Sequence, residues 1–93
     1  MIKSFGSKTT QRIWQRTYTK KIPDDIQERA RKKLILIDAA ETLNDLRIPP
    51  GNRLEQLRGD RKGQHSVRIN NQWRICFVWD GGDAYAVEIV DYH

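Results

Sequence analysis

The sequence predicts an α+β domain in which two N-terminal helices pack on one face of a four- to five-stranded, mainly antiparallel sheet. Apolar residues at helical spacing follow Pro23, and Pro49-Pro50-Gly51 stops any helix from continuing. Beyond that break come four short runs rich in valine, isoleucine and aromatic residues, separated by turn residues. A helical half followed by a strand half is typical of helices covering one side of a sheet.

The helical half contains two predicted helices. Ile2–Phe5 alternates weakly and favours an opening strand, after which Ser7 is the expected N-cap of a helix that runs to about Gln15. Asp24 and Gln27 predict a capping box at the start of the second helix. That helix has an apolar stripe at spacings of four, four and three, formed by Ile26, Ala30, Leu34 and Ile37.

The strand half is predicted to be a meander. Its four runs are Arg53–Leu57, Gln64–Asn70, Trp73–Trp79 and Ala84–Val90. Asn70-Asn71-Gln72 and Asp80-Gly81-Gly82 favour tight hairpins, whereas Gly59–Gly63 favours a looser loop. Pairing the strands about these turns predicts that Ile69 lies opposite Arg74 and that Arg68 lies opposite Ile75.

Length and composition predict one domain spanning residues 1–93, because 93 residues leave little room for a second core. The longest aliphatic run, Leu34–Ile37, is far shorter than the roughly 18 apolar residues that span a membrane. Residues 1–10 lack the apolar segment of a secretory signal, so we expect a cytoplasmic protein without a membrane partner. Cys76 is the single cysteine, which excludes an internal disulfide and favours a small buried residue.

Charge is distributed in blocks along the chain. Residues 1–22 contain six basic and no acidic residues, and residues 47–79 contain seven basic and two acidic ones. The last fourteen residues contain four acids and no base. Basic blocks of this kind favour a polyanion or an acidic protein as partner, because neutralised phosphates release counterions. A basic surface that only aids solubility explains the charge equally well.

The expected hairpins gather polar side chains at one end of the sheet. This cluster consists of Glu55, Arg68, Arg74, Asp91 and Tyr92. Arg58 lies about three residues further along its strand, roughly 10 Å away, which a long side chain can largely bridge. A register slip of one residue would turn each of these side chains to the opposite face.

Such a cluster has the groups that cleave RNA through its own 2′-hydroxyl. Arginine stabilises the pentavalent phosphate, and Glu55 or Asp91 is the candidate base. Tyr92 or His93 is the candidate proton donor, and Trp73 or Tyr92 the candidate to stack on a nucleotide base.

The alternative is structural. Arg68 with Glu55, and Arg74 with Asp91, can equally form ordinary cross-strand ion pairs. His65 alternates with Val67 on one strand face, which favours a structural residue. No metal-ligand spacing and no glycine-rich phosphate loop is visible, so we expect neither a metal nor a cofactor.

Two segments of the sequence resemble a known family. The run from Leu54 to Phe77, with its sequence LEQLRGDRKGQHSVRINNQWRICF, and the C-terminal Asp91-Tyr92-His93 are similar to the HigB toxins, also called plasmid maintenance system killer proteins. The opening Met1–Phe5 fits as well, so that the resemblance spans essentially the whole chain. HigB toxins belong to the RelE/ParE superfamily, which implies a RelE-like fold.

The resemblance also implies an activity and partners. It implies a type II toxin, a metal-independent and ribosome-dependent endoribonuclease that cuts mRNA in the decoding site. A helix-turn-helix antitoxin is expected to neutralise it, and the complex is expected to bind operator DNA. Within the same superfamily, ParE-like toxins inhibit DNA gyrase without cutting RNA. A domain that only binds its antitoxin and DNA is a third possibility.

Site residues follow from the resemblance position by position. It implies that Arg58 is the basic residue after the first leucine pair, that Arg74 is the transition-state arginine, and that Asp91 and Tyr92 are the C-terminal catalytic pair. Arg68, Trp73 and His93 are then expected to contact substrate. Some family members have a histidine where this chain has Glu55, so the identity of the general base is open.

Overall fold

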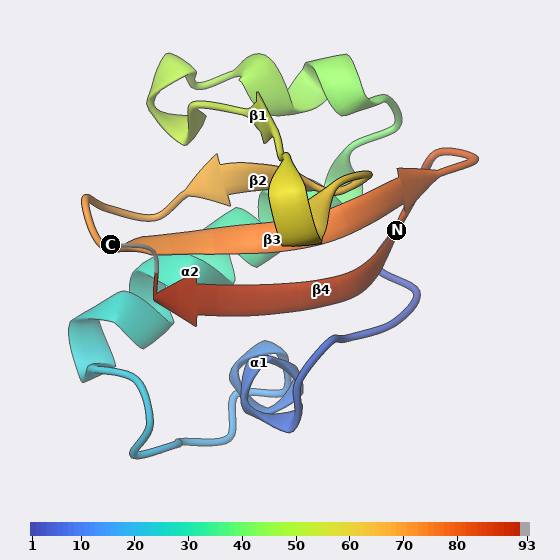
Figure 1. Cartoon of the computed structure of the whole chain (residues 1–93). Helices are drawn as coiled ribbons and strands as arrows, with labels where there is room; N and C mark the ends of the chain where they lie inside the picture. Colours follow the sequence, from blue (N-terminus) through green and yellow to red (C-terminus); the bar gives the residue numbers. More distant parts are fainter. Residues whose placement is uncertain (92–93) are drawn as a thin grey trace.

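A computed structural model describes residues 1–91 of the chain. It contains helices α1 (Lys8–Trp14) and α2 (Asp24–Ala39) and a four-stranded antiparallel sheet in the order β1-β2-β3-β4. The strands are β1 (Glu55–Gln56), β2 (His65–Arg68), β3 (Trp73–Asp80) and β4 (Asp83–Asp91), and both helices lie on one side of them (Figure 1). The α+β architecture is therefore confirmed.

Helix α1 begins where the sequence predicts. The Ser7 hydroxyl accepts a hydrogen bond from the backbone N–H of Thr10 at 3.2 Å, which satisfies one of the free donors of the first turn. The Thr10 hydroxyl accepts in turn from the backbone N–H of Ile89, at 2.9 Å. Thr10 therefore both binds the cap residue Ser7 and attaches the first turn of α1 to β4.

Helix α2 carries the predicted stripe but not the predicted cap. All four stripe residues are buried, at most 4% exposed. Pro23 is the N-cap, and the Gln27 amide instead donates to the carbonyl oxygens of Thr19 at 2.7 Å and Ile22 at 2.6 Å. The prediction of a capping box at Asp24 was wrong, because the side chain of Gln27 instead forms hydrogen bonds to the connection between α1 and α2.

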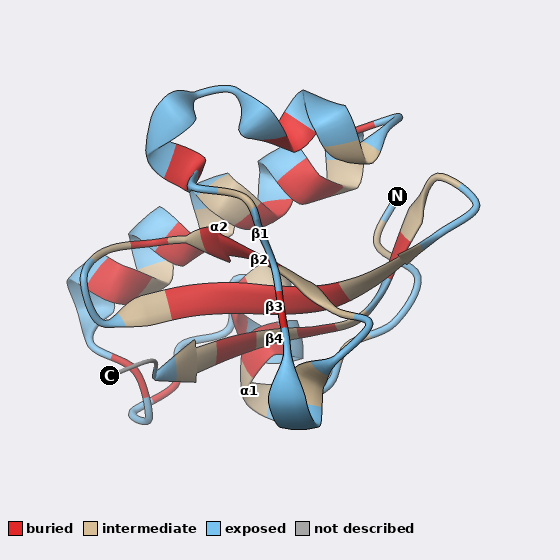
Figure 2. Ribbon diagram, turned by 45° about the horizontal axis from the view of Figure 1, so that its top comes forward, coloured by how far each residue is buried: buried red, intermediate tan, exposed pale blue. Residues whose placement is uncertain are grey.

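Alternation along β3 separates the two faces of the sheet. Ile75 and Phe77 are fully buried in the core against α2, whereas Arg74 and Cys76 point to the opposite face. The red segments of β3 and α2 face each other across this core (Figure 2). The outer face of the sheet is the one without helices, and it carries the candidate site.

A short segment passes across the outer face. The connection from β1 to β2 contains a 3-10 helix, η3 (Gly59–Arg61). Its ribbon lies in front of β3 in Figure 1, and the connection passes across β3 and β4 in Figure 2. The Arg61 guanidinium forms an ion pair with Glu88 of β4 at 3.2 Å, and it also donates to the side chain of Gln64. This connection, predicted as a loose loop, is therefore fastened to the far strand of the sheet.

The first hairpin differs from the predicted register by one residue. Arg74 lies opposite Arg68 and not opposite Ile69, and Ile75 lies opposite Val67. The turn is longer than expected because the Asn70 side-chain oxygen accepts from the backbone N–H groups of Gln72 and Trp73, both at 2.8 Å. An asparagine side chain that closes its own turn is common, but it is not visible from spacing alone.

The second hairpin is as predicted, and β4 contains an irregularity. Gly81 and Gly82 both have positive φ, which is typical of a two-residue type I′ turn. The β3–β4 pairing shifts between Cys76 and Val78, and Ala86 of β4 has a φ of 51°. Residues 2 and 5 form isolated parallel bridges to β4 on either side of this bulge, so the expected opening strand is reduced to two contacts.

Two further 3-10 helices were not expected from the sequence. They are η1 (Leu43–Arg47) and η2 (Pro50–Asn52), between α2 and β1. At the start of η1 the Asp45 carboxylate accepts from the backbone N–H groups of Glu41 and Thr42, both at 3.0 Å. These backbone hydrogen bonds lower the pKa of Asp45 below its usual value. The capping box of this chain is therefore at Thr42 and Asp45.

Candidate active site

A pair of arginines lies at one end of the outer face. Arg68 of β2 and Arg74 of β3 are direct cross-strand neighbours, and the side chains of such partners lie on the same face. Arg74 is buried, with 7% of its surface exposed, whereas Arg68 is half-buried. Two guanidinium groups on one face form a positively charged surface suited to a phosphate.

Arg74 is held by groups from two other strands and a loop. Its Nε donates to the Ser66 hydroxyl at 2.8 Å, and its Nη2 donates to the backbone carbonyl of Arg53 at 2.7 Å. Its Nη1 lies 3.9 Å from Oε1 of Glu55. The guanidinium therefore has a fixed orientation, and the Nη1 side is the one that faces an exposed carboxylate.

The remaining predicted residues on this face are less closely connected. Arg68 donates from Nε to the carbonyl of Asn70 at 3.1 Å and from Nη2 to the side chain of Asn71. Arg58 is exposed and lines a hollow of about 430 Å³ together with Gln56, Leu57 and Lys62. Arg58 is thus on the β1–β2 connection, and the described contacts do not join it to Arg74.

Asp91 and Trp73 lie at the same end of the sheet as Arg74 but on its opposite face. They are cross-strand partners, and alternation places both on the side of Ile75 and Ile89, which face the helices. Trp73 packs partly buried against the core, and Asp91 accepts from the side-chain amide of Gln72 at 3.1 Å. The predicted catalytic Tyr92 and substrate contact His93 are outside the described residues.

The ion pair found on this face differs from both of the expected cross-strand pairs, Arg68 with Glu55 and Arg74 with Asp91. Glu55 lies opposite Ser66 and its carboxylate faces Arg74, not Arg68. The one-residue change of register places Arg74 on the same face as Arg68 and Glu55, whereas Asp91 lies on the opposite face. The structure thus brings together Glu55, Arg68 and Arg74 on one face of the sheet.

His65 and Cys76 have the structural environments predicted for them. Burial lowers the pKa of His65, whose ring lies 6.2 Å from that of Phe77. Cys76 is fully buried, and burial raises the pKa of its thiol, opposed by the nearby charges of Arg61 and Arg74. Neither residue has the environment of a nucleophile or a general base.

Three residues of this site were not predicted from the sequence. They are Ser66 and Arg53, which hold Arg74, and Arg61, which fastens the connection above the face. Ser66 was within reach of prediction, since a serine two residues before Arg68 shares its strand face. In residues 1–91, no three histidine, cysteine or acidic side chains come together as a metal site would require.

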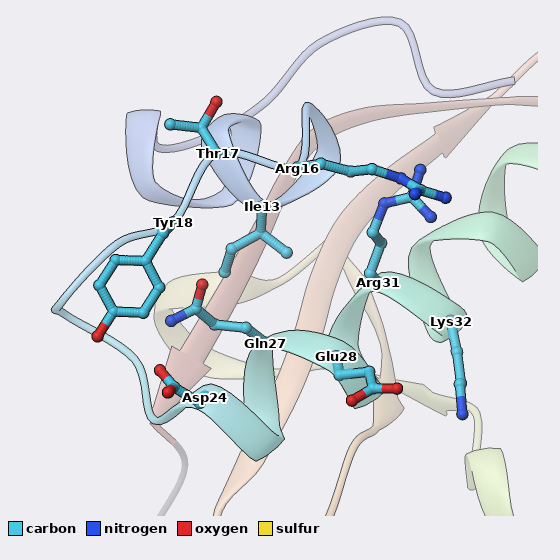
Figure 3. A pocket seen from close by; sticks show the side chains of 9 residues that line it. All are labelled: Ile13, Arg16, Thr17, Tyr18, Asp24, Gln27, Glu28, Arg31 and Lys32. Atoms are coloured by element: carbon cyan, nitrogen blue, oxygen red, sulfur yellow. The ribbon is translucent and has the colours of Figure 1, made fainter.

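A separate pocket of about 460 Å³ lies between the end of α1 and the first turns of α2 (Figure 3). Ile13 forms part of its apolar lining, and Tyr18, which is 62% exposed, lies at its edge. The Arg31 guanidinium lies 5.7 Å from the ring of Trp14, and among the described residues its buried Nε has no hydrogen-bond partner. The pocket is formed by the helices and not by the outer face of the sheet.

Comparison with known proteins defines the class. The family model described as "RelE-like toxin of type II toxin-antitoxin system HigB" matches residues 3–93. The chain is 34% identical to Endoribonuclease HigB of Proteus vulgaris over all of both chains. It is 49% identical to Toxin HigB-1 of Vibrio cholerae over 63 residues, which are 68% of this chain and 66% of that protein.

A structural comparison agrees with these sequence matches. The YoeB–YefM complex of Staphylococcus aureus contains a chain that matches this fold with a TM-score of 0.63 at 18% identity, covering all of this chain and 98% of that one. The expected RelE-like fold is confirmed. The chain belongs to the HigB-like family of type II toxins.

The described part of the chain has no helix long and apolar enough to cross a membrane.

Proposed function

We propose that this toxin is a metal-independent endoribonuclease that cuts translated mRNA by attack of a 2′-hydroxyl on the adjacent phosphate. The observation that carries the proposal is the fixed guanidinium of Arg74, with Arg68 opposite and the Glu55 carboxylate 3.9 Å from Nη1. A positive group with a fixed orientation stabilises the developing phosphorane charge at little reorganisation cost. The similarity to Endoribonuclease HigB supports the same chemistry.

The proposal assigns a role to each residue of the predicted site. Arg74 stabilises the transition state, and Glu55 is the candidate base on the outer face. Asp91 and Tyr92 form the C-terminal pair at which the leaving oxygen is protonated. Arg58 is proposed as a further catalytic residue, as the family resemblance implies, and the expected substrate contacts are Arg68, Trp73 and His93. Asp91 and Arg74 lie on opposite faces of the sheet. The RNA is therefore expected to pass around the end of the sheet to reach both residues.

The ribosome has a physical role in this proposal. The described part of the site has no histidine near Arg74 that would act as a base near neutral pH, and Arg74 itself is largely buried. A partner that bends the mRNA would supply proximity and orientation, which are worth several orders of magnitude in rate. We therefore propose cleavage in the decoding site, in the cytoplasm, and little cleavage of free RNA.

Mapping transcript ends tests the activity. The toxin is induced in cells, mRNA ends are mapped by primer extension, and plasmid supercoiling is measured in the same cultures. New ends inside translated messages are expected, with normal supercoiling. Intact transcripts with blocked supercoiling would instead identify a gyrase inhibitor of the ParE-like type. Equal cleavage of free and ribosome-bound mRNA would contradict the ribosome dependence.

An antitoxin is the second proposed partner. We infer that a helix-turn-helix antitoxin neutralises the chain and that the complex binds operator DNA, as family membership implies. The pocket between α1 and α2 suits a protein segment with an apolar side chain for Ile13 and a carboxylate for the neighbouring Arg16 and Arg31. Asp24 and Glu28 line other parts of the pocket, so the carboxylate is expected only beside the two arginines. Arg31→Glu is expected to weaken binding of the purified antitoxin at least tenfold, whereas Lys62→Glu on the outer face is not.

A further inference from the structure

Ser66 is a fully buried hydroxyl on the outer face of the sheet. It is 0% exposed, and its Oγ accepts a hydrogen bond from Nε of Arg74 at 2.8 Å. The backbone carbonyl of the same residue lies 3.4 Å from Nη2 of Arg74. One residue of β2 therefore binds two different nitrogens of the same guanidinium.

A second group holds the guanidinium from the loop before β1. The carbonyl of Arg53 accepts from Nη2 at 2.7 Å, and Arg53 has a left-handed conformation with φ of 43° and ψ of 58°. A non-glycine residue in this region is strained. The backbone strain thus occurs at the residue whose carbonyl holds Arg74.

Together these contacts determine which side of Arg74 is presented to a ligand. Nε and Nη2 are bound by Ser66 and Arg53, while Nη1 is directed to the exposed carboxylate of Glu55. An arginine side chain has many rotamers, and a guanidinium that must be ordered during the reaction adds that entropy to the barrier. Ordering it in advance removes this cost.

We propose that Ser66 is a positioning residue for the cleavage reaction, acting through Arg74 by fixing its guanidinium before RNA binds. This inference rests on the proposed endoribonuclease function. Ser66 does not touch the substrate, because its side chain is fully buried beneath the face. Its loss is expected to slow the chemical step and to leave the affinity for the ribosome–mRNA complex unchanged.

Cleavage kinetics on programmed ribosomes test the proposal. Ser66→Ala is expected to lower kcat about tenfold with an unchanged KM, since a hydrogen bond to a charged group is lost. Ser66→Thr, which keeps the hydroxyl, is expected to retain more of the activity than Ser66→Ala. Cys76→Ala is the matched control, because Cys76 is the cross-strand partner of Ser66 and is equally buried. It is expected to cleave at the wild-type rate.

A double-mutant cycle separates positioning from a general structural role. If Ser66 acts through Arg74, Ser66→Ala has no further effect on kcat in an Arg74→Ala background. Equal losses in both backgrounds would overturn the proposal. A kcat of Ser66→Ala equal to that of the wild type would also overturn the proposal, if the wild-type protein cleaves mRNA. A wild-type protein that cleaves no mRNA at all would overturn the endoribonuclease function and the positioning role with it.

An NMR measurement gives a second readout that does not depend on cleavage. The Nε–H of Arg74 is expected to exchange slowly with solvent and to be ordered in the wild type, and to exchange at least tenfold faster in Ser66→Ala. Backbone amide spectra of the same samples report whether the variant is folded. A folded variant with unchanged exchange at this group would contradict the proposed contact.

Discussion

Arg68 and Arg74 lie directly opposite each other on neighbouring strands, although like charges in this position repel. Arg74 is bound by Ser66, Arg53 and Glu55, whereas Arg68 contacts only turn residues in the described hydrogen bonds. The two arginines therefore differ in what they contribute to the folded state. Arg74 is integrated into the sheet, and Arg68 is the more adjustable of the two.

Substituting Arg68 is expected to separate stability from activity. In Arg68→Gln the loss of exposed turn contacts is offset by relief of the repulsion from Arg74, so the free energy of unfolding should change by less than about 0.5 kcal/mol. KM for ribosome-bound mRNA should rise severalfold. Urea denaturation and cleavage kinetics measure the two effects, and an unchanged KM would remove Arg68 from substrate binding.

Arg74 is expected to be intolerant even of lysine. An ammonium group lacks the planar fork that meets Ser66 and Arg53 together, so Arg74→Lys should abolish growth arrest. Antitoxin binding should persist, since the helix pocket is distant from this face in the fold. Arg12→Lys on α1 is the control, and it should arrest growth normally. Toxicity of Arg74→Lys at the wild-type level would exclude the proposed role.

Two leucines of α2 provide a matched pair for the core. Leu34 is fully buried and Leu36 is 38% exposed. Leu34→Ala is expected to lower the free energy of unfolding by about 2 to 5 kcal/mol because it leaves a cavity. Leu36→Ala should change it by about 0.5 kcal/mol or less. Equal effects in chemical denaturation would contradict the orientation of α2.

His65 predicts a dependence of stability on pH. Burial lowers its pKa below the ordinary 6.5, so the unfolded chain takes up the proton first as the pH falls. The stability that the neutral ring contributes is therefore complete above about pH 6.5 and declines below it. Denaturation curves between pH 7.5 and 5 should show this decline for the wild type, and a smaller decline for His65→Phe. Parallel curves for both proteins would contradict the buried position.

The single cysteine offers a simple probe of folding. Cys76 is 0% exposed, and burial raises the pKa of its thiol, so a thiol reagent should react with it only when the sheet opens. Labelling at neutral pH should be slower than for the unfolded chain by several orders of magnitude. Immediate stoichiometric labelling of the folded protein would mean that the outer face is open around β3.

Most of the fold was predictable because it depends on local patterns. The stripe of α2, the Ser7 cap and the Gly81-Gly82 turn were confirmed, since each depends on residues close in sequence. Side chains that bind distant backbone were not predictable. Gln27 closes a loop and is not part of a cap, and Asn70 lengthens a turn and so changes the register of β2 and β3.

The candidate site was predicted in part, for the same reason. The shared face of Glu55, Arg68 and Arg74 follows from strand pairing once the turn is known. The role of Arg53 could not be anticipated, because it depends on a left-handed backbone conformation and not on a side chain. Arg61, in the β1–β2 connection, contacts Glu88 of β4. The two residues are 27 positions apart in the sequence, and no periodicity indicates such a contact.

The ion pair between Arg61 and Glu88 makes the outer face sensitive to ionic strength. Both side chains are about one-third exposed, and dissolved ions weaken an exposed pair, with a screening length of roughly 8 Å at physiological salt and about 3 Å at 1 M. The contact between the β1–β2 connection and β4 is therefore expected to be stronger in dilute buffer than in concentrated salt. Activities of this toxin and its variants are comparable only when they are measured at one common salt concentration.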